Sequence, residues 1–166
     1  MTGPESAGEA PADVVAGTTA EAARDTLLAE LNLLLEAERA GAKVALASRK
    51  AAAGPAHAAL MAVVQADEAR WCAMLSRQIR RLGGEPTPAT GTFREKALAI
   101  ADPLERLAFL NRGQAWVMRR LDALMPLAGD AALRADLRDM AESHRLNIGR
   151  TEVFLATEQR RGESAK

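Results

Sequence analysis

The amino-acid sequence predicts an all-α protein, an antiparallel four-helix bundle with a long crossover between its second and third helices. Its 166 residues include 37 Ala and 21 Leu but only 7 Val, 3 Ile and no Tyr, so helix formers are abundant and strand formers are scarce. Prolines and paired glycines interrupt the chain at few places, and apolar residues recur at helical spacing between them.

Composition also narrows the classes of function. The chain has 22 basic and 22 acidic residues, so bulk attraction to nucleic acid is not expected. No uncharged apolar run is long enough to span a bilayer, and the single cysteine, Cys72, cannot close an internal disulfide. We therefore expect a cytoplasmic protein that binds neither nucleic acid nor a membrane.

The predicted domain organisation has three parts. Residues 1–20 contain no Lys or Arg and lack the apolar core of a secretory signal, which predicts a disordered tail. Residues 21–160 form the bundle, and residues 161–166 form a flexible C-terminus. The predicted helices cover 20–53, 56–82, 93–101, 103–126 and 130–160.

Helix starts carry capping residues, and the connections suggest the topology. The capping pairs are Thr18 with Glu21 and Thr92 with Glu95, and the single caps are Asp102 and Asp130. Tight turns at Gly54 and Gly129 predict two helical hairpins. The 83–102 segment is long enough to run the length of the bundle, which predicts the crossover.

One polar residue interrupts the apolar stripe of each long helix. These four residues are Glu38, Glu68, Gln114 and His144. Glu38 lies 16 residues before Gly54 and Glu68 lies 14 after it, while Gln114 and His144 lie 15 residues before and after Gly129. At 1.5 Å per residue, all four are about 21 to 24 Å from their turns. The sequence therefore predicts one polar layer in the core, whose members must pair, bind water or bind a metal.

Two segments resemble a known group of proteins. The stretch LNLLLEAERAGAK resembles the first helix of ferritin-like proteins of the bacterioferritin and rubrerythrin kind, in which a glutamate at the position of Glu38 binds metal. DEARWCAMLSRQIRRLGGEP is similar to their second metal-binding helix and brings Glu68 onto a ligand position. The motifs DEARWC, LNRGQAW and ESH also resemble an uncharacterised bacterial ferritin-like domain of unknown function. The resemblance implies the ferritin-like fold over about residues 26–156.

The di-iron site of that group takes one Glu from each of two helices and a Glu-x-x-His pair from each of the other two. Here Gln114, Trp71 and Ala141 occupy three of those ligand positions. Glu38, Glu68 and His144 match, which implies a degenerate di-iron site.

Three interpretations of function stay open. The first is a binding or interaction module, expected as a homodimer, whose polar layer is a metal-free relic. The second is a metalloprotein or oxidoreductase with one Fe, Mn or Zn ion held by Glu38, Glu68 and His144, with Gln114 as an optional ligand. The third is an iron-storage or stress-protection assembly. The sequence does not decide whether the chain is an enzyme.

Several other residues carry weaker signals. Glycines inside helices predict close helix approach, within the bundle or at a dimer seam, at Gly41, Gly113 and Gly149. His57 is expected at the surface, and Asp67 as a solvated or Arg-paired carboxylate at the bundle edge. Cys72 is expected as a small buried hydrophobe.

Overall fold

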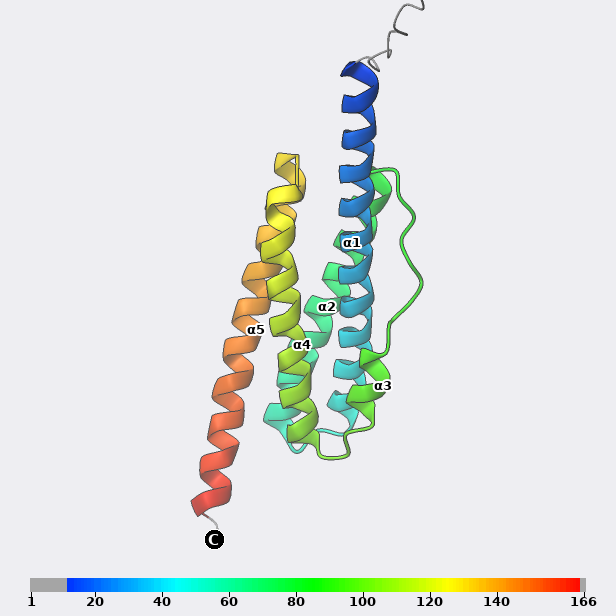
Figure 1. Cartoon of the computed structure of the whole chain (residues 1–166). Coiled ribbons are helices and arrows are strands. Elements are labelled where there is room, and N and C mark those ends of the chain that lie inside the picture. The colour runs from blue at the N-terminus through cyan, green and yellow to red at the C-terminus, as the bar shows by residue number, and fades with distance from the viewer. Residues whose placement is uncertain (1–11, 165–166) are drawn as a thin grey trace, which may run out of the picture.

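Four long helices make up most of the computed structural model, which describes residues 12–164 (Figure 1). The elements in chain order are α1 (Ala12–Lys50), α2 (Pro55–Arg81), α3 (Phe93–Leu98), α4 (Pro103–Leu124), the 3₁₀ turn η1 (Met125–Leu127) and α5 (Ala131–Ser164). No strand occurs within this part of the chain. The predicted all-α class is confirmed, and no described helix is long and apolar enough to cross a bilayer.

The topology is the predicted pair of hairpins. Helices α1 and α2 run antiparallel on either side of the turn at Gly54, and α4 and α5 do the same (Figure 1). Between them the chain runs back along the outside of α1, so that α2 and α4 point the same way. Helix α1 packs beside α4 and α2 packs beside α5, which makes all neighbouring pairs antiparallel.

The capping chemistry matches the prediction at two of the helix starts. The Asp102 carboxylate accepts hydrogen bonds from the Leu104 and Glu105 amides, at 2.9 and 2.8 Å, at the start of α4. Asp130 accepts one from the Leu133 amide at 2.9 Å. The Thr92 side chain makes no capping bond, so the predicted capping box is not formed there.

Both ends of the bundle differ from the predicted boundaries. Helix α1 begins at Ala12, within the predicted 1–20 tail, and α5 continues to Ser164, within the predicted flexible 161–166 end. The backbone is already helical before Thr18 and continues as helix through it, so the predicted helix start there is wrong. Residues 1–11 of the predicted tail lie outside the described residues.

Side chains of α1 bind the backbone of the crossover and hold it against that helix. We call residues 83–92 the crossover strap. Arg39 donates to the carbonyls of Thr87 and Ala89, at 2.7 and 2.6 Å. Asn32 donates to the Glu85 carbonyl at 3.2 Å and accepts from the Thr87 amide at 2.7 Å. The strap is thereby held along the flank of α1, beside the middle of the bundle.

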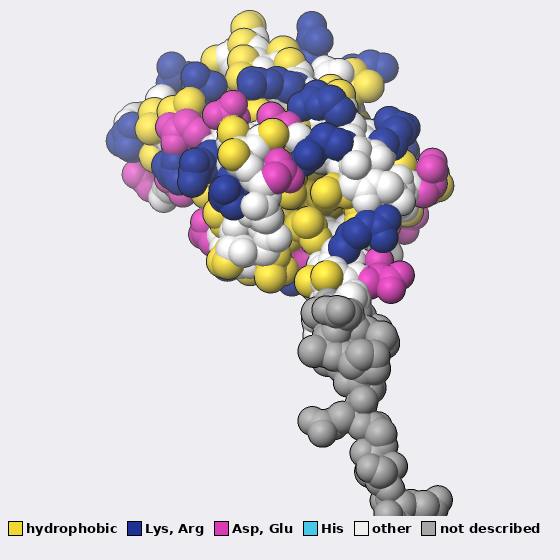
Figure 2. Space-filling view, turned by 90° about the horizontal axis from the view of Figure 1, so that it is seen from above, with side chains coloured by type: hydrophobic (Ala, Val, Ile, Leu, Met, Phe, Trp, Pro, Cys, Tyr) yellow, Lys and Arg dark blue, Asp and Glu magenta, His cyan; other side chains and the backbone are white. Residues whose placement is uncertain are grey.

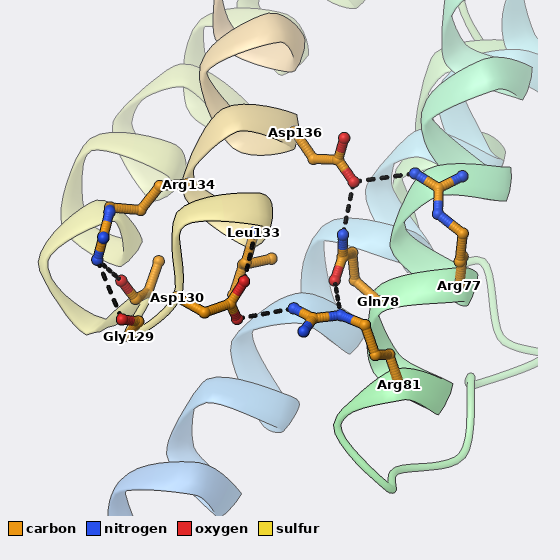
Figure 3. A network of polar contacts seen from close by, with 9 residues as sticks. Arg77, Gln78, Arg81, Gly129, Asp130, Leu133, Arg134 and Asp136 are labelled. Carbon is orange, nitrogen blue, oxygen red and sulfur yellow. Dashed lines mark hydrogen bonds and ion pairs between the residues drawn. The ribbon is translucent and has the colours of Figure 1, made fainter.

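A network of polar contacts joins the end of α2 to the start of α5 (Figure 3). Asp136 accepts hydrogen bonds from Arg77 at 2.9 Å and from Gln78 at 2.6 Å. Arg81 donates to Gln78 and to Asp130, both at 2.7 Å, and this contact lowers the pKa of Asp130. Arg77 and Arg81, near the C-terminal end of α2, thus form ion pairs with aspartates of the same chain. Basic and acidic side chains are interspersed on the end face seen in Figure 2.

The apolar core falls into two clusters. One cluster is built around Leu31, Leu75, Leu121 and Leu137, and the other around Val44, Met61, Val64, Leu107 and Leu110. Along α1, α2 and α4, one polar residue of the predicted layer comes between the residues of the two clusters. The layer therefore interrupts the core near its middle.

Candidate metal centre

The four polar residues predicted to share one layer come from the four long helices. Glu38 lies on α1, Glu68 on α2, Gln114 on α4 and His144 on α5, and their exposed fractions are 0%, 4%, 3% and 2%. Each belongs to its helix's inward-facing stripe, so the packing that buries the leucines also buries these polar groups. Buried carboxylates are costly unless they have ionic or hydrogen-bond partners. The contacts within the layer therefore determine how Glu38 and Glu68 are stabilised.

Three of the four side chains could supply ligand atoms to one metal ion. One atom from each of Glu38, Glu68 and His144 lies within 4.8 Å of the others. His144 Nε2 is 3.1 Å from Glu38 Oε1. Gln114 Nε2 donates to Glu68 Oε1 at 3.4 Å, so the amide contacts a carboxylate of the cluster.

The imidazole of His144 is oriented by the backbone of its own helix. Nδ1 lies 3.1 Å from the Met140 carbonyl, which can only accept, so Nδ1 carries a hydrogen and donates it. Nε2 is left to face Glu38, whether it holds a proton or a metal ion. A backbone carbonyl on the far ring nitrogen is a common feature of histidine metal ligands.

Burial and charge set the protonation of the cluster. Burial, followed by the negative charge of Glu38, raises the pKa of the Glu68 carboxyl well above its usual value. For His144, burial lowers the pKa, but attraction to Glu38 outweighs burial and the pKa is raised overall. Without metal, burial and the neighbouring Glu38 carboxylate therefore favour the neutral form of Glu68, and attraction to Glu38 favours the protonated form of His144.

Polar atoms in the layer remain without hydrogen bonds among the described residues. Both Glu38 oxygens and His144 Nε2 are fully buried and have no hydrogen-bond partner there, although Glu38 Oε1 lies 3.1 Å from His144 Nε2. Two carboxylates and an imidazole are a donor set suited to one Fe, Mn or Zn ion. The cluster offers ligand atoms for one ion, whereas Trp71, Gln114 and Ala141 stand where the resemblance to di-iron proteins implies further ligands, so the residues present do not fit two ions.

A helix glycine makes room for one of these carboxylates. A Cβ built on Gly41 would lie 2.5 Å from Glu68 Oε2, so the absent side chain is the space that the carboxylate occupies. At Gly113 a Cβ would lie 2.6 Å from the Phe93 ring. A Cβ built on Gly149 would meet no atom of a neighbouring element within 4 Å among the described residues. Close approach within the chain therefore occurs at two of the three predicted glycines.

Asp67 and His57 differ from their predicted environments. Asp67 is half-buried and accepts hydrogen bonds from Ser143 at 3.0 Å and Asn147 at 2.9 Å, both on α5, where solvent or an arginine was expected. His57 is buried, with its ring centroid 5.5 Å from that of Phe154, and the predicted surface position is wrong. His57 lies four residues before Met61, which belongs to the apolar stripe of α2. This helical spacing is the sequence signal that brings His57 onto the buried face of the helix.

Cys72 lies beside the cluster and is not a ligand candidate. Its side chain is half-buried against the apolar core. Burial, together with the negative charge of Glu38, raises the pKa of its thiol to about 12. A thiol in this environment is unreactive, as the sequence predicted for a small apolar residue.

Fold and site together describe a ferritin-like four-helix bundle with a buried cluster of two carboxylates and an imidazole at its centre. Among solved structures, the chain is similar to a ferritin-like, diiron-carboxylate protein from Bacillus anthracis str. Ames, at 19% identity and a TM-score of 0.71. The match covers 80% of this chain and 97% of that one, and it shows the shared fold. Residues 25–153 match the family model described as a domain of unknown function (DUF6306), and the chain belongs to that family. A comparison with curated proteins finds no match.

The space at Gly41 yields a prediction with an internal control. For the metal site proposed below, Gly41→Ala should displace the Glu68 carboxylate and weaken binding of Mn²⁺ by about tenfold or more. Gly149→Ala, within α5 and facing open space, should instead stabilise the protein by about 1 kcal/mol and leave metal affinity unchanged. Isothermal titration and urea unfolding measure the two effects. Equal metal affinity in both variants would contradict this role for Gly41.

His57 predicts a pH dependence of stability. Burial and the nearby Arg106 on α4 lower its pKa, and Glu158 on α5 only partly offsets them. The unfolded chain therefore binds more protons than the folded chain as pH falls below about 6.5, and stability is lost in that direction. His57→Gln should flatten the dependence of unfolding free energy on pH between about 7 and 5, measured by urea denaturation. Parallel curves for the two proteins would disprove it.

Proposed function

We infer that this chain is a ferritin-like metalloprotein that binds one divalent transition-metal ion at the centre of the bundle. The observation that carries this proposal is the burial of Glu38, Glu68 and His144 with one ligand atom of each within 4.8 Å of the others. Glu38 and Glu68 would supply carboxylate oxygens, and His144 would supply Nε2. A bound Fe, Mn or Zn ion would supply Lewis-acid chemistry, and Fe or Mn also redox chemistry.

The chain's own residues would prepare this site for a cation. The Met140 carbonyl holds the imidazole so that Nε2 faces the carboxylates. Gly41 leaves room for Glu68, and Gln114 donates to one oxygen of that carboxylate. A metal would displace the proton from Glu68, so binding should weaken as pH falls.

A metal-free interaction module is the second candidate. It is favoured by the protonation of the layer, because a neutral Glu68 and a His144–Glu38 ion pair can coexist without an added cation. In that case the layer would fix the register of the helices.

Metal analysis separates the two candidates. The full chain is purified without a nickel column or chelator, its metal content is measured, and the demetallated protein is titrated with Mn²⁺, Fe²⁺ and Zn²⁺. The proposal expects one ion per chain, with the affinity of Glu38→Gln and His144→Gln reduced by about tenfold to a hundredfold. Glu142→Gln, an exposed carboxylate near His144, is the matched control. No saturable binding would leave the interaction module, and many ions per chain would indicate storage.

Self-association remains a prediction, and α5 offers a specific surface for it. Leu146 and Val153 are 49% and 69% exposed, and Gly149 lies between them on the same helix with open space before it. Helical spacing brings these three onto one face, which would permit flat contact with a second copy. Light scattering at high micromolar concentration should report a dimer that Val153→Asp converts to a monomer. A monomeric parent protein would contradict the prediction.

A further inference from the structure

A cavity of about 560 Å³ lies beside the polar layer. It is bounded by α1, α3, α4 and the end of the crossover strap, and its size is within the range of about 300–1,000 Å³ seen for small-molecule sites. Two members of the layer, Glu68 and Gln114, line it. Because both are almost fully buried, they mark its inner end.

The walls of the cavity are apolar and partly aromatic. Phe93 from α3 stacks on Phe109 from α4, with ring centroids 5.0 Å apart and planes 18° apart. Gly113 allows this arrangement, because a Cβ there would lie 2.6 Å from the Phe93 ring. Trp116 and Leu33 add further apolar surface. Such walls suit a hydrocarbon chain or an aryl group.

The rim of the cavity is basic. Lys96, Arg112 and Arg119 line it and are exposed, and none of them forms an ion pair among the described residues. Glu36 is the one acidic residue besides Glu68 among the lining residues, and it accepts a hydrogen bond from Thr87 at 3.2 Å. The outer end therefore carries three cations against one carboxylate, in a protein whose formal net charge is zero.

We propose that this cavity binds a medium-chain monocarboxylic acid, with its carboxylate at Lys96, Arg112 and Arg119 and its apolar chain directed towards Glu68. The reverse orientation would carry the charged carboxylate into the buried inner end of the cavity, where loss of solvation and the nearby Glu38 carboxylate would oppose it. Binding itself does not require a metal ion.

Probe ligands of equal chain length test the charge complementarity. Decanoate, decanol and decyltrimethylammonium are titrated calorimetrically into the full chain, below their micelle concentrations, with and without chelator. One decanoate should bind per chain, about tenfold more tightly than decanol, since exposed charge pairs contribute up to about 1 kcal/mol each. Decyltrimethylammonium should bind most weakly. Equal affinity for all three ligands would overturn the proposal.

Variants at the rim and the wall sharpen the test. Lys96→Glu with Arg112→Glu should reverse the order, so that decyltrimethylammonium binds more tightly than decanoate. Ala37→Phe, which fills space at the α1 wall, should reduce the affinity for all three ligands. Arg138→Ala, an exposed arginine on α5 away from the cavity, is the control and should change nothing. Retention of decanoate preference in the Lys96→Glu, Arg112→Glu variant would disprove the assigned orientation.

Comparing the decanoate titrations with and without chelator separates this inference from the proposed metal site. Decanoate binding in the chelated protein supports the cavity as a carboxylate site, whatever the outcome of the metal titrations. Metal binding without any decanoate binding overturns the inference and leaves the proposed metal site intact.

Discussion

Replacing His144 by alanine in the metal-free protein should cost about 3–5 kcal/mol of unfolding free energy. His144 Nε2 is the atom 3.1 Å from Glu38, whose side chain is fully buried and forms no hydrogen bond among the described residues. Removal of the imidazole would strand a carboxylate in the core, and an unpaired buried charge is far more costly than a lost contact. Urea unfolding near neutral pH with chelator present measures the effect.

A double variant separates the ion pair from simple loss of packing. Glu38→Leu with His144→Leu removes both charges and keeps apolar volume, so its stability should equal the parent's or exceed it by up to about 4 kcal/mol. This variant should not bind metal. A double variant less stable than His144→Ala would mean that the pair itself, through its fit to the core, stabilises the fold.

Restoring the missing ligands should create a two-metal site. Trp71→His, Gln114→Glu and Ala141→Glu convert three buried positions, and 68 with 71 and 141 with 144 are i, i+3 pairs on the faces that already point into the layer. The triple variant should bind about two ferrous ions per chain, where the parent binds one at most. It should lose several kcal/mol of metal-free stability, because an indole is removed and charge is added to the core.

Metal should therefore raise the melting temperature of the triple variant far more than that of the parent. Calorimetric iron titration under anaerobic conditions and thermal unfolding with and without iron provide the two readouts. The same three substitutions combined with Glu38→Ala serve as the control, since they retain the two added carboxylates without a complete site. A folded triple variant with unchanged stoichiometry would show that these positions do not face one another.

The sequence predicted most of the fold because its helix boundaries depend on local chemistry. Asp102 and Asp130 cap helices through bonds that span three residues or fewer, so their role is visible without tertiary structure. Thr18 shows where local signals fail, because the backbone continues as helix through a residue that has capping chemistry.

The polar layer was predictable because helices convert residue spacing into height. Glu38, Glu68, Gln114 and His144 are nearly equidistant from their turns, and the structure brings them together at one level. The cavity was not predictable, since part of its wall comes from residues 90–93, whose path depends on bonds from Asn32 and Arg39 to the strap. Periodicity says nothing about where an extended segment lies on a helix.

The single cysteine offers a way to time the opening of this bundle. With a thiol pKa of about 12 and a half-buried side chain, Cys72 should react slowly with a thiol reagent while the helices stay closed. Its labelling rate under excess reagent would then approach the rate at which α2 separates from its neighbours. Because Cys72 is the one cysteine of the sequence, this labelling rate can be measured without an engineered cysteine. A ligand that binds the polar layer of the closed bundle should lower the labelling rate of Cys72.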